Sequence, residues 1–186
     1  MRSGDGWSVC DQGHRHWGRF GAAGLLLIRP GSIRPGSIRP GSIRGGSIRP
    51  GSIGPGQVFL QLRSAYIHHG GTWSIPGGAR DSHESPVQAS MREAREEIGL
   101  LTGNVEIVGE FVDDHGGWSY TTVFGHPIGE PELLHNHEST EMAWVPIDAV
   151  PELPLHPGFR ISWPLVEALV HEYLDGGSPE RPSTWG

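Results

Sequence analysis

The stretch over residues 78–100, GARDSHESPVQASMREAREEIGL, constrains the fold of this chain more than any other part of the sequence. Ser85 is placed to cap a helix, and Pro86 suits its first turn. Gln88, three residues after Ser85, completes a capping box. Gly99 suits the left-handed residue that ends a helix. The sequence therefore predicts a helix from Pro86 to Ile98.

Two sides of this helix carry different side chains. An apolar stripe at helical spacing, which we expect to pack inward, consists of Val87, Met91, Ala94 and Ile98. The i, i+3 and i+4 spacing of Glu93, Glu96 and Glu97 gathers three carboxylates on the flank opposite this stripe. Carboxylates so close together repel one another and raise each other's pKa unless a cation lies among them.

A divalent cation is the natural partner for this carboxylate cluster. Oxygen ligands without cysteine or patterned histidine favour Mg²⁺ or Mn²⁺ over zinc. The ordinary alternative is a solvated acidic face balanced by Arg92 and Arg95. The flanking residues decide against that alternative, because Gly78, Glu84, Arg92 and Gly99 stand at the spacing of a known protein family.

The complete pattern resembles the Nudix box. It consists of Gly78, Glu84, Arg92-Glu93, an apolar position at Ala94, Arg95, Glu96-Glu97, Ile98, Gly99 and Leu100. Ala94 is smaller than the aliphatic residue usual at its position. The chain is thus similar to Nudix hydrolases, which cleave nucleoside diphosphates linked to another group. The resemblance implies an α/β (α+β) fold, with an α/β/α sandwich around a mixed β-sheet.

The resemblance also implies roles for single residues. The carboxylates that match Glu93, Glu96 and Glu97 hold Mg²⁺, with Mn²⁺ as the alternative ion, and one carboxylate activates water. Arg92 orients a neighbouring carboxylate, and Glu84 assists from the loop. Glu138, six residues before Trp144, is similar to the glutamate outside the box that completes the metal site in nucleoside-triphosphate members; Glu141 is the reserve.

Length and composition limit the class of protein. The 186 residues, 35% of them hydrophobic, suit one globular domain with appendages. The formal charge of −7 argues against a general nucleic-acid binder.

One cysteine, Cys10, rules out an internal disulfide and fits a reducing compartment. No stretch has the length of a membrane span or the pattern of a signal peptide. We expect a cytoplasmic enzyme with a nucleotide substrate; a homodimer is one possible assembly.

The N-terminal segment over residues 1–18 has no clear period and is expected to be an irregular arm before a Nudix domain over residues 19–175. Cys10, His14 and His16 suggest a metal site. Three candidates without a fourth partner at zinc spacing favour an arm without a metal. Residues 176–186 are expected to form a flexible tail.

Residues 29–56 consist largely of RPGSI repeats, in which glycine and proline disfavour both helix and ladder pairing. A stacked solenoid is the alternative, but five short units with proline scarcely bury a core. We expect a low-complexity loop insertion. Strands at Phe20–Ile28 and Gln57–Arg63 are predicted to flank it and to pair as a hairpin, since loop closure costs little more for a long loop.

Further strands are predicted at residues 105–112, 118–124 and 141–145, and a closing helix at residues 161–174 with Pro164 near its first turn. The segment over residues 71–78 resembles the Nudix segment that leads a short strand into the box. Its Trp73 is expected in the core. The residues expected to contact the substrate are Arg63, Gly77, Gly78, Trp118 and Tyr120.

The substrate is inferred by subtraction. Dinucleoside-polyphosphate members of the family carry a tyrosine, and ADP-ribose members a proline, at set distances after the box; neither is in place here, and the longer NADH motif is absent. A nucleoside triphosphate, cleaved to monophosphate and pyrophosphate, is therefore favoured. The alternatives are an ADP-ribose, nucleotide-sugar or dinucleoside-polyphosphate hydrolase, or a Nudix domain that binds a nucleotide without turnover. Intact Glu93, Glu96 and Glu97 argue against binding alone.

Overall fold

The computed structural model describes residues 2–31, 55–131, 134 and 139–176. A seven-stranded sheet has the order β5-β4-β3-β8-β7, with β6 pairing to β3 and β9 to β4. Its strands are β3 (Ala22–Arg29), β4 (Gln57–Arg63), β5 (Trp73–Ser74), β6 (Gly77–Ala79), β7 (Val105–Asp114), β8 (Ser119–Pro127) and β9 (Ser139–Pro146). Strands β3 and β8 are parallel, while the other pairs are antiparallel, so the sheet is mixed.

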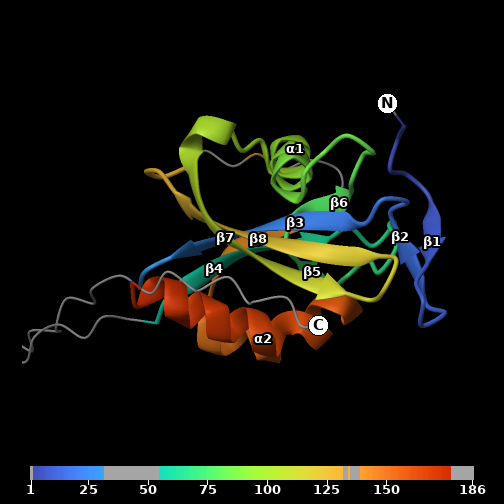
Figure 1. The fold of residues 1–186 in the computed structure, drawn as a ribbon. Coiled ribbons are helices and arrows are strands. Elements are labelled where there is room, and N and C mark those ends of the chain that lie inside the picture. The colour runs from blue at the N-terminus through green and yellow to red at the C-terminus, as the bar shows by residue number, and fades with distance from the viewer. Residues whose placement is uncertain (1, 32–54, 132–133, 135–138, 177–186) are drawn as a thin grey trace, which may run out of the picture.

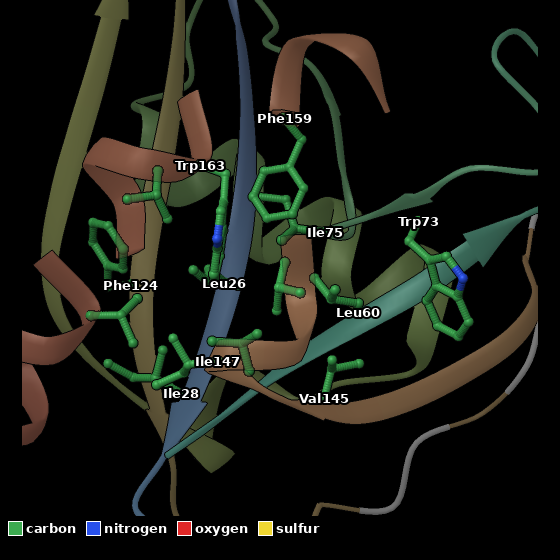
Figure 2. Close-up of a cluster of buried hydrophobic side chains, with 14 of the residues drawn as sticks. Leu26, Ile28, Leu60, Trp73, Ile75, Phe124, Val145, Ile147, Phe159 and Trp163 are labelled. Carbon is green, nitrogen blue, oxygen red and sulfur yellow. The ribbon is translucent and has the colours of Figure 1, made fainter. Parts of the chain in front are cut away.

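Helices cover both faces of this sheet (Figure 1). Helix α1 (Pro86–Ile98) packs on one face through a cluster that includes Leu25, Leu27 and Phe59. Helix α2 (Pro157–Leu174) and the 3-10 helix η2 (Ile147–Glu152) cover the other face. Adjacent residues of β3 point to opposite faces of the sheet. Leu26 and Ile28 therefore belong to a second hydrophobic cluster, which lies under α2 and η2 (Figure 2). The expected α/β/α sandwich is confirmed.

Local signals in the sequence set the bounds of α1. The side chain of Ser85 accepts a hydrogen bond from the Gln88 backbone, and the Gln88 side chain accepts one from the Ser85 backbone, so the predicted capping box is present. Gly99 ends the helix at φ 70°. The short side chain of Ala94 is fully buried against the sheet. Helix α1 therefore begins and ends where the sequence predicts.

The two strands that flank the RPGSI repeat pair as predicted. Strands β3 and β4 are antiparallel, with Ile28 opposite Val58 and Arg29 opposite Gln57. The first strand begins at Ala22 rather than Phe20. Trp73 is 8% exposed and lies in the core, as expected. Residues 32–54, most of the expected insertion, and the expected tail over residues 177–186 lie outside the described residues.

Two expectations about the chain ends were wrong. The N-terminal segment is not an irregular arm, because β1 (Trp7–Val9) and β2 (Arg15–Trp17) form an antiparallel hairpin. The hairpin escaped detection because its three-residue strands are too short to establish a period. Helix α2 begins at Pro157 instead of Ile161, so that Pro164 lies inside it. Pro157 takes the first helical position, where its missing N–H costs nothing.

Candidate functional site

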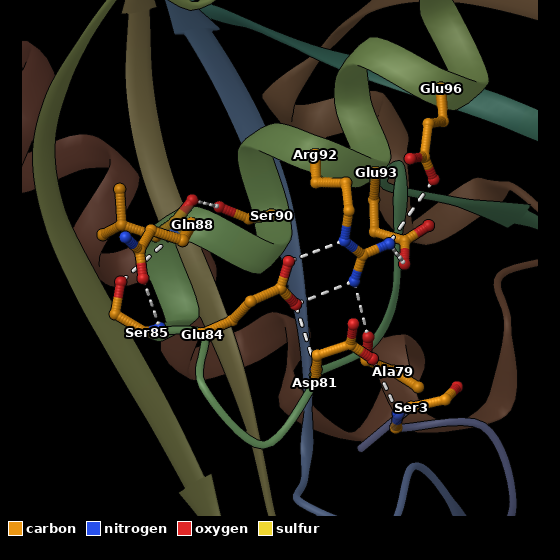
Figure 3. A network of polar contacts seen from close by, with 12 residues as sticks. Ser3, Ala79, Asp81, Glu84, Ser85, Gln88, Ser90, Arg92, Glu93 and Glu96 are labelled. Carbon is orange, nitrogen blue, oxygen red and sulfur yellow. Dashed lines mark hydrogen bonds and ion pairs between the residues drawn. The ribbon is translucent and has the colours of Figure 1, made fainter. Parts of the chain in front are cut away.

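The guanidinium group of Arg92 joins helix α1 to the loop before it (Figure 3). Its Nε and Nη2 donate to the two carboxylate oxygens of Glu84 at 2.7 and 2.9 Å. Nη2 also donates to the carbonyl oxygen of Ala79 in β6 at 2.9 Å. Nη1 donates to Glu93 at 2.6 Å and contacts Glu96 at 3.4 Å. Arg92 thus holds the loop, strand β6 and two of the three predicted metal ligands together.

These contacts fix the charge state of the loop carboxylate. The hydrogen bond from Arg92 lowers the pKa of Glu84, against the opposing effect of burial, and the Asp81 backbone N–H adds a further bond at 3.0 Å. The same contacts raise the pKa of Arg92. Glu84 therefore serves as an anionic anchor for Arg92, which fits the assisting role that the resemblance implies.

Glu93 lies directly over the backbone of Gly78. A Cβ atom at Gly78 would lie 2.6 Å from Glu93 Oε1. Glycine is thus required for the carboxylate to approach strand β6 so closely. Gly77, its neighbour, faces the other way: a Cβ there would lie 2.5 Å from the Gly24 Cα of β3. One glycine makes room for a predicted metal ligand, and the other makes room for strand pairing.

Glu97 is 4% exposed and turns toward the sheet, in contrast to Glu96, whose side chain is 52% exposed. The expectation that all three carboxylates share the flank opposite the apolar stripe is therefore wrong for Glu97. Its Oε2 accepts from Gln61 Nε2 at 2.7 Å and from the Gly77 backbone N–H at 3.0 Å. Two donors on one oxygen fix the orientation of this carboxylate.

Sequence reasoning missed Gln61. It lies in β4, is 2% exposed and donates to Glu97 across the face covered by α1. The sequence did contain one signal for this role, because Gln61 is a polar residue within the largely apolar centre of a strand. Gln61 Oε1 is also buried, and it has no hydrogen-bond partner in the part of the chain that the structure describes. A buried acceptor beside a carboxylate fits a site that holds a hydrated cation.

The carboxylate cluster therefore fits a hard divalent cation. Its donors are oxygens from Glu93, Glu96 and Glu97, the ligand type that Mg²⁺ and Mn²⁺ prefer. The resemblance of residues 78–100 to the Nudix box implies such an ion. Glu138, the predicted ligand outside the box, lies outside the described residues. Its reserve, Glu141, is exposed and pairs with Leu62 of β4, whose side chain packs on the cluster under α2. Residues opposite one another share a face, so Glu141 points away from the carboxylates and is not a candidate.

A second acidic group, formed by Asp81, His83 and Glu84, lies in the loop before α1. Asp81 Oδ1 already accepts from the Gly4 backbone N–H at 2.7 Å, and Glu84 is bound to Arg92. These carboxylates therefore stabilise the loop and the start of the chain.

A cavity of about 560 Å³ lies beside β6. It is enclosed by the β1–β2 hairpin, the end of β4, the β7–β8 turn and the start of α2, and its lining is rich in aromatic and histidine side chains. All five residues expected to contact the substrate contribute to this lining, namely Arg63, Gly77, Gly78, Trp118 and Tyr120. Because Gly78 also contacts Glu93, the cavity and the carboxylate cluster share one stretch of wall. The volume suits a nucleotide-sized ligand.

The aromatic residues of the cavity are held in different ways. Trp118 is 9% exposed, donates from Nε1 to the Gly18 carbonyl oxygen at 2.9 Å and stacks against His16 with ring centroids 4.0 Å apart. One of its faces is therefore covered. Burial raises the pKa of Tyr120, which keeps its hydroxyl protonated at neutral pH. Trp118 and Tyr120, expected as substrate contacts, are thus also partly core residues.

His156 lies at the start of α2, where it lines the cavity. Its pKa is lowered to about 4, mainly by burial and in smaller part by the nearby His69 and Arg63. The rings of His156 and His69 meet edge-on with centroids 4.7 Å apart. This wall of the cavity therefore carries neutral imidazole at physiological pH.

Comparison with known proteins identifies the family. Residues 23–168 match the family model of the NUDIX domain, so the chain belongs to the Nudix family. A Mycobacterium tuberculosis (strain ATCC 25618 / H37Rv) protein named "Putative 8-oxo-dGTP diphosphatase 3" is 43% identical over 166 residues, covering 86% of this chain and 67% of the relative. A Bifidobacterium longum protein named "Nucleoside triphosphate pyrophosphatase/Nudix hydrolase fusion protein" is 38% identical over 91% of this chain, which spans only 32% of that relative.

Solved structures agree with this assignment. A Nudix hydrolase from M. Smegmatis, RenU, has a TM-score of 0.74 and 40% sequence identity, covering 90% of this chain and 96% of that one. A C. elegans Ap4A hydrolase, at 16% identity and a TM-score of 0.56, shares the fold. The chain is thus a Nudix hydrolase. Among the described residues, no helix has the length and apolar character that crossing a membrane requires.

Substitution of Gly78 tests its role beside Glu93. We expect Gly78→Ala to displace the Glu93 carboxylate and to weaken Mn²⁺ binding about tenfold or more. The free energy of unfolding should fall by less than about 1 kcal/mol, because a flexible carboxylate can move. Mn²⁺ titration by electron paramagnetic resonance and urea denaturation measure the two effects.

Gly77→Ala provides a contrast in stability, because its new Cβ meets the β3 backbone rather than a flexible side chain. It should lower the free energy of unfolding by about 2 kcal/mol or more. Equal Mn²⁺ affinity in Gly78→Ala and the wild type would contradict the account.

The lowered pKa of His156 predicts a stability change with pH. The unfolded state binds the His156 proton more tightly than the folded state does. The contribution of neutral His156 to the free energy of unfolding is therefore complete above the ordinary pKa of about 6.5 and is lost as the pH falls through about 4. When the pH is lowered from about 7 to about 4.5, the free energy of unfolding should fall in both proteins. The fall should be about 1–2 kcal/mol smaller in His156→Gln than in the wild type, a value reduced because His156 is partly exposed. Urea denaturation measures this difference. The exposed His171→Gln variant should follow the wild type, and identical pH slopes in all three proteins would refute the assignment.

Proposed function

We propose that this protein hydrolyses a nucleoside triphosphate to the monophosphate and pyrophosphate with Mg²⁺ as its metal. The observation that carries the proposal is the intact set of Glu93, Glu96 and Glu97, joined to the substrate-sized cavity through Gly77 and Gly78. A domain that only binds nucleotide has no need of three carboxylates held by Arg92 and Gln61. The proposal therefore favours an enzyme over a binding module.

An oxidised purine nucleotide is the substrate that we favour within this class. The M. tuberculosis relative carries a name that refers to 8-oxo-dGTP, and it is 43% identical to this chain. The cavity offers aromatic surfaces for a base, including Tyr120 and the two tryptophans of the β1–β2 hairpin, Trp7 and Trp17. Aromatic surfaces of this kind bind flat purine rings by stacking.

In this proposal the metal would be held by Glu93, Glu96 and Glu97, together with Glu138 as the ligand predicted from the sequence alone. When bound, such an ion neutralises phosphate oxygens and lowers the pKa of water. Arg92 positions Glu93, and the donors Gln61 and Gly77 position Glu97.

Proton transfer needs a carboxylate that water can reach. The side chain of Glu96 is 52% exposed, which suits this role, and Glu138 is the alternative. Attack of water on the α- or β-phosphorus, in line with the leaving pyrophosphate or nucleoside monophosphate respectively, then breaks the α–β anhydride bond. The protein contributes mainly positioning and charge stabilisation.

The activity is tested with a panel of canonical and oxidised nucleoside triphosphates, ADP-ribose, dinucleoside polyphosphates and NADH, each with Mg²⁺ and with a chelator. We expect Mg²⁺-dependent release of monophosphate and pyrophosphate, with the highest kcat/KM for an oxidised purine triphosphate. Preferred cleavage of ADP-ribose or a dinucleoside polyphosphate would overturn the substrate assignment. Absence of turnover across the panel would favour a binding module.

Glu97→Gln separates catalysis from binding. The substitution keeps an oxygen for the two donors and removes the negative charge, so the fold should be retained. We expect kcat to fall about 10²–10⁴-fold. Glu152→Gln, at an exposed carboxylate of η2, is the matched control and should keep full activity. Unchanged kcat in Glu97→Gln would exclude Glu97 from the reaction.

A further inference from the structure

Four potential metal ligands meet at the edge of the cavity, away from the carboxylate cluster. They are Cys10, His14, His16 and His115, and one ligand atom from each lies within 4.8 Å of all the others. The first three come from the β1–β2 hairpin, and His115 comes from the turn between β7 and β8. His115 is the fourth partner that sequence spacing could not supply, because it stands 99 residues after His16 in the chain.

Backbone contacts dock the two turns that carry these ligands. The Asp11 N–H donates to the Gly116 carbonyl oxygen at 2.9 Å. Within the hairpin turn, the Cys10 N–H donates to the His14 carbonyl oxygen at 3.0 Å. The positions of Cys10 and His115 relative to one another are thus set by hydrogen-bonded backbone rather than by exposed side chains alone.

The environment of His16 is a second, independent sign of a ligand. Its Nε2 atom is buried and has no hydrogen-bond partner among the residues that the structure describes. Its ring is fixed by stacking on Trp118 and lies 4.6 Å from the ring of His115. A buried ring nitrogen without a partner is unfavourable, because it has lost its hydrogen bond to water and gained none in return. A metal ion would satisfy it.

We propose that Cys10, His14, His16 and His115 bind one zinc ion. A thiolate with three imidazoles is a donor set that favours Zn²⁺ over Mg²⁺. Tetrahedral zinc places its ligand atoms about 3.3–3.6 Å apart, so small side-chain rotations from the present separations complete the site. Binding converts the Cys10 thiol to a thiolate and releases its proton to solvent.

Neighbouring residues support this geometry. Asp113 Oδ2 lies 3.5 Å from His115 Nε2, and a carboxylate beside a liganding histidine orients its ring in many zinc sites. Cys10 is 3% exposed and packs with Trp118. Four protein ligands leave no position for substrate, so the zinc is structural. It joins the hairpin to the β7–β8 turn and thereby fixes one wall of the cavity, which His14, His16 and His115 line.

Metal analysis of the untagged protein, grown with zinc, tests the site. We expect about one zinc per chain by inductively coupled plasma mass spectrometry, and at least about a tenfold loss in Cys10→Ser and His14→Ala. His14 is exposed, so its replacement removes a ligand without disturbing the core. Circular dichroism verifies that both variants fold.

Two controls locate the ion. His171→Ala removes an exposed histidine of α2 and should keep about one zinc, as should Glu97→Gln in the carboxylate cluster. Because Cys10 is the single cysteine, its reaction with a thiol reagent should be slow with zinc and fast after chelation. In the wild type, Co²⁺ should produce a thiolate-to-cobalt charge-transfer band that Cys10→Ser lacks. The proposal would be overturned if the wild type contained no zinc and gave no cobalt band. It would also be overturned if zinc persisted in both Cys10→Ser and His14→Ala.

Discussion

The hydrogen bonds of Arg92 are the interaction on which the arrangement of the site depends. One planar guanidinium group reaches the loop through Glu84, strand β6 through the Ala79 carbonyl oxygen and the helix surface through Glu93. A lysine could supply the charge but not this fixed set of directions. The same group offsets the repulsion among carboxylates on α1. Helix, loop and strand are therefore held in one geometry by a single side chain.

The close packing of α1 on the sheet extends this geometry to the cavity. Gly78 lets Glu93 approach β6, while Gln61 and the Gly77 N–H fix Glu97. These contacts need a glycine pair and a buried amide at positions where a sheet would otherwise carry apolar side chains. The carboxylates and the cavity thus share a wall whose shape is set by backbone, which is stiffer than a wall of side chains.

The sequence predicted those parts of the fold that depend on local signals. The capping box and Gly99 predicted both ends of α1, and the strand predicted at Gln57–Arg63 matches β4 to the residue. Contacts between distant segments left no local signal, which is why the hydrogen bond from Gln61 to Glu97 and the meeting of Cys10 with His115 appeared only in the structure. For the site, Arg92 with its glutamate partners was expected, whereas the inward turn of Glu97 was not. Their catalytic roles, and that of Glu138, remain predictions.

Crystals soaked in Mn²⁺ and measured for anomalous scattering test most directly whether the carboxylates of α1 form the metal site. The account predicts an anomalous peak within coordinating distance of Glu93 and Glu97, about 2.0–2.3 Å from their oxygens. The peak should vanish in Glu97→Gln crystals that retain the fold. Mn²⁺ bound only at other positions, with Glu93 and Glu97 uncoordinated, would contradict it.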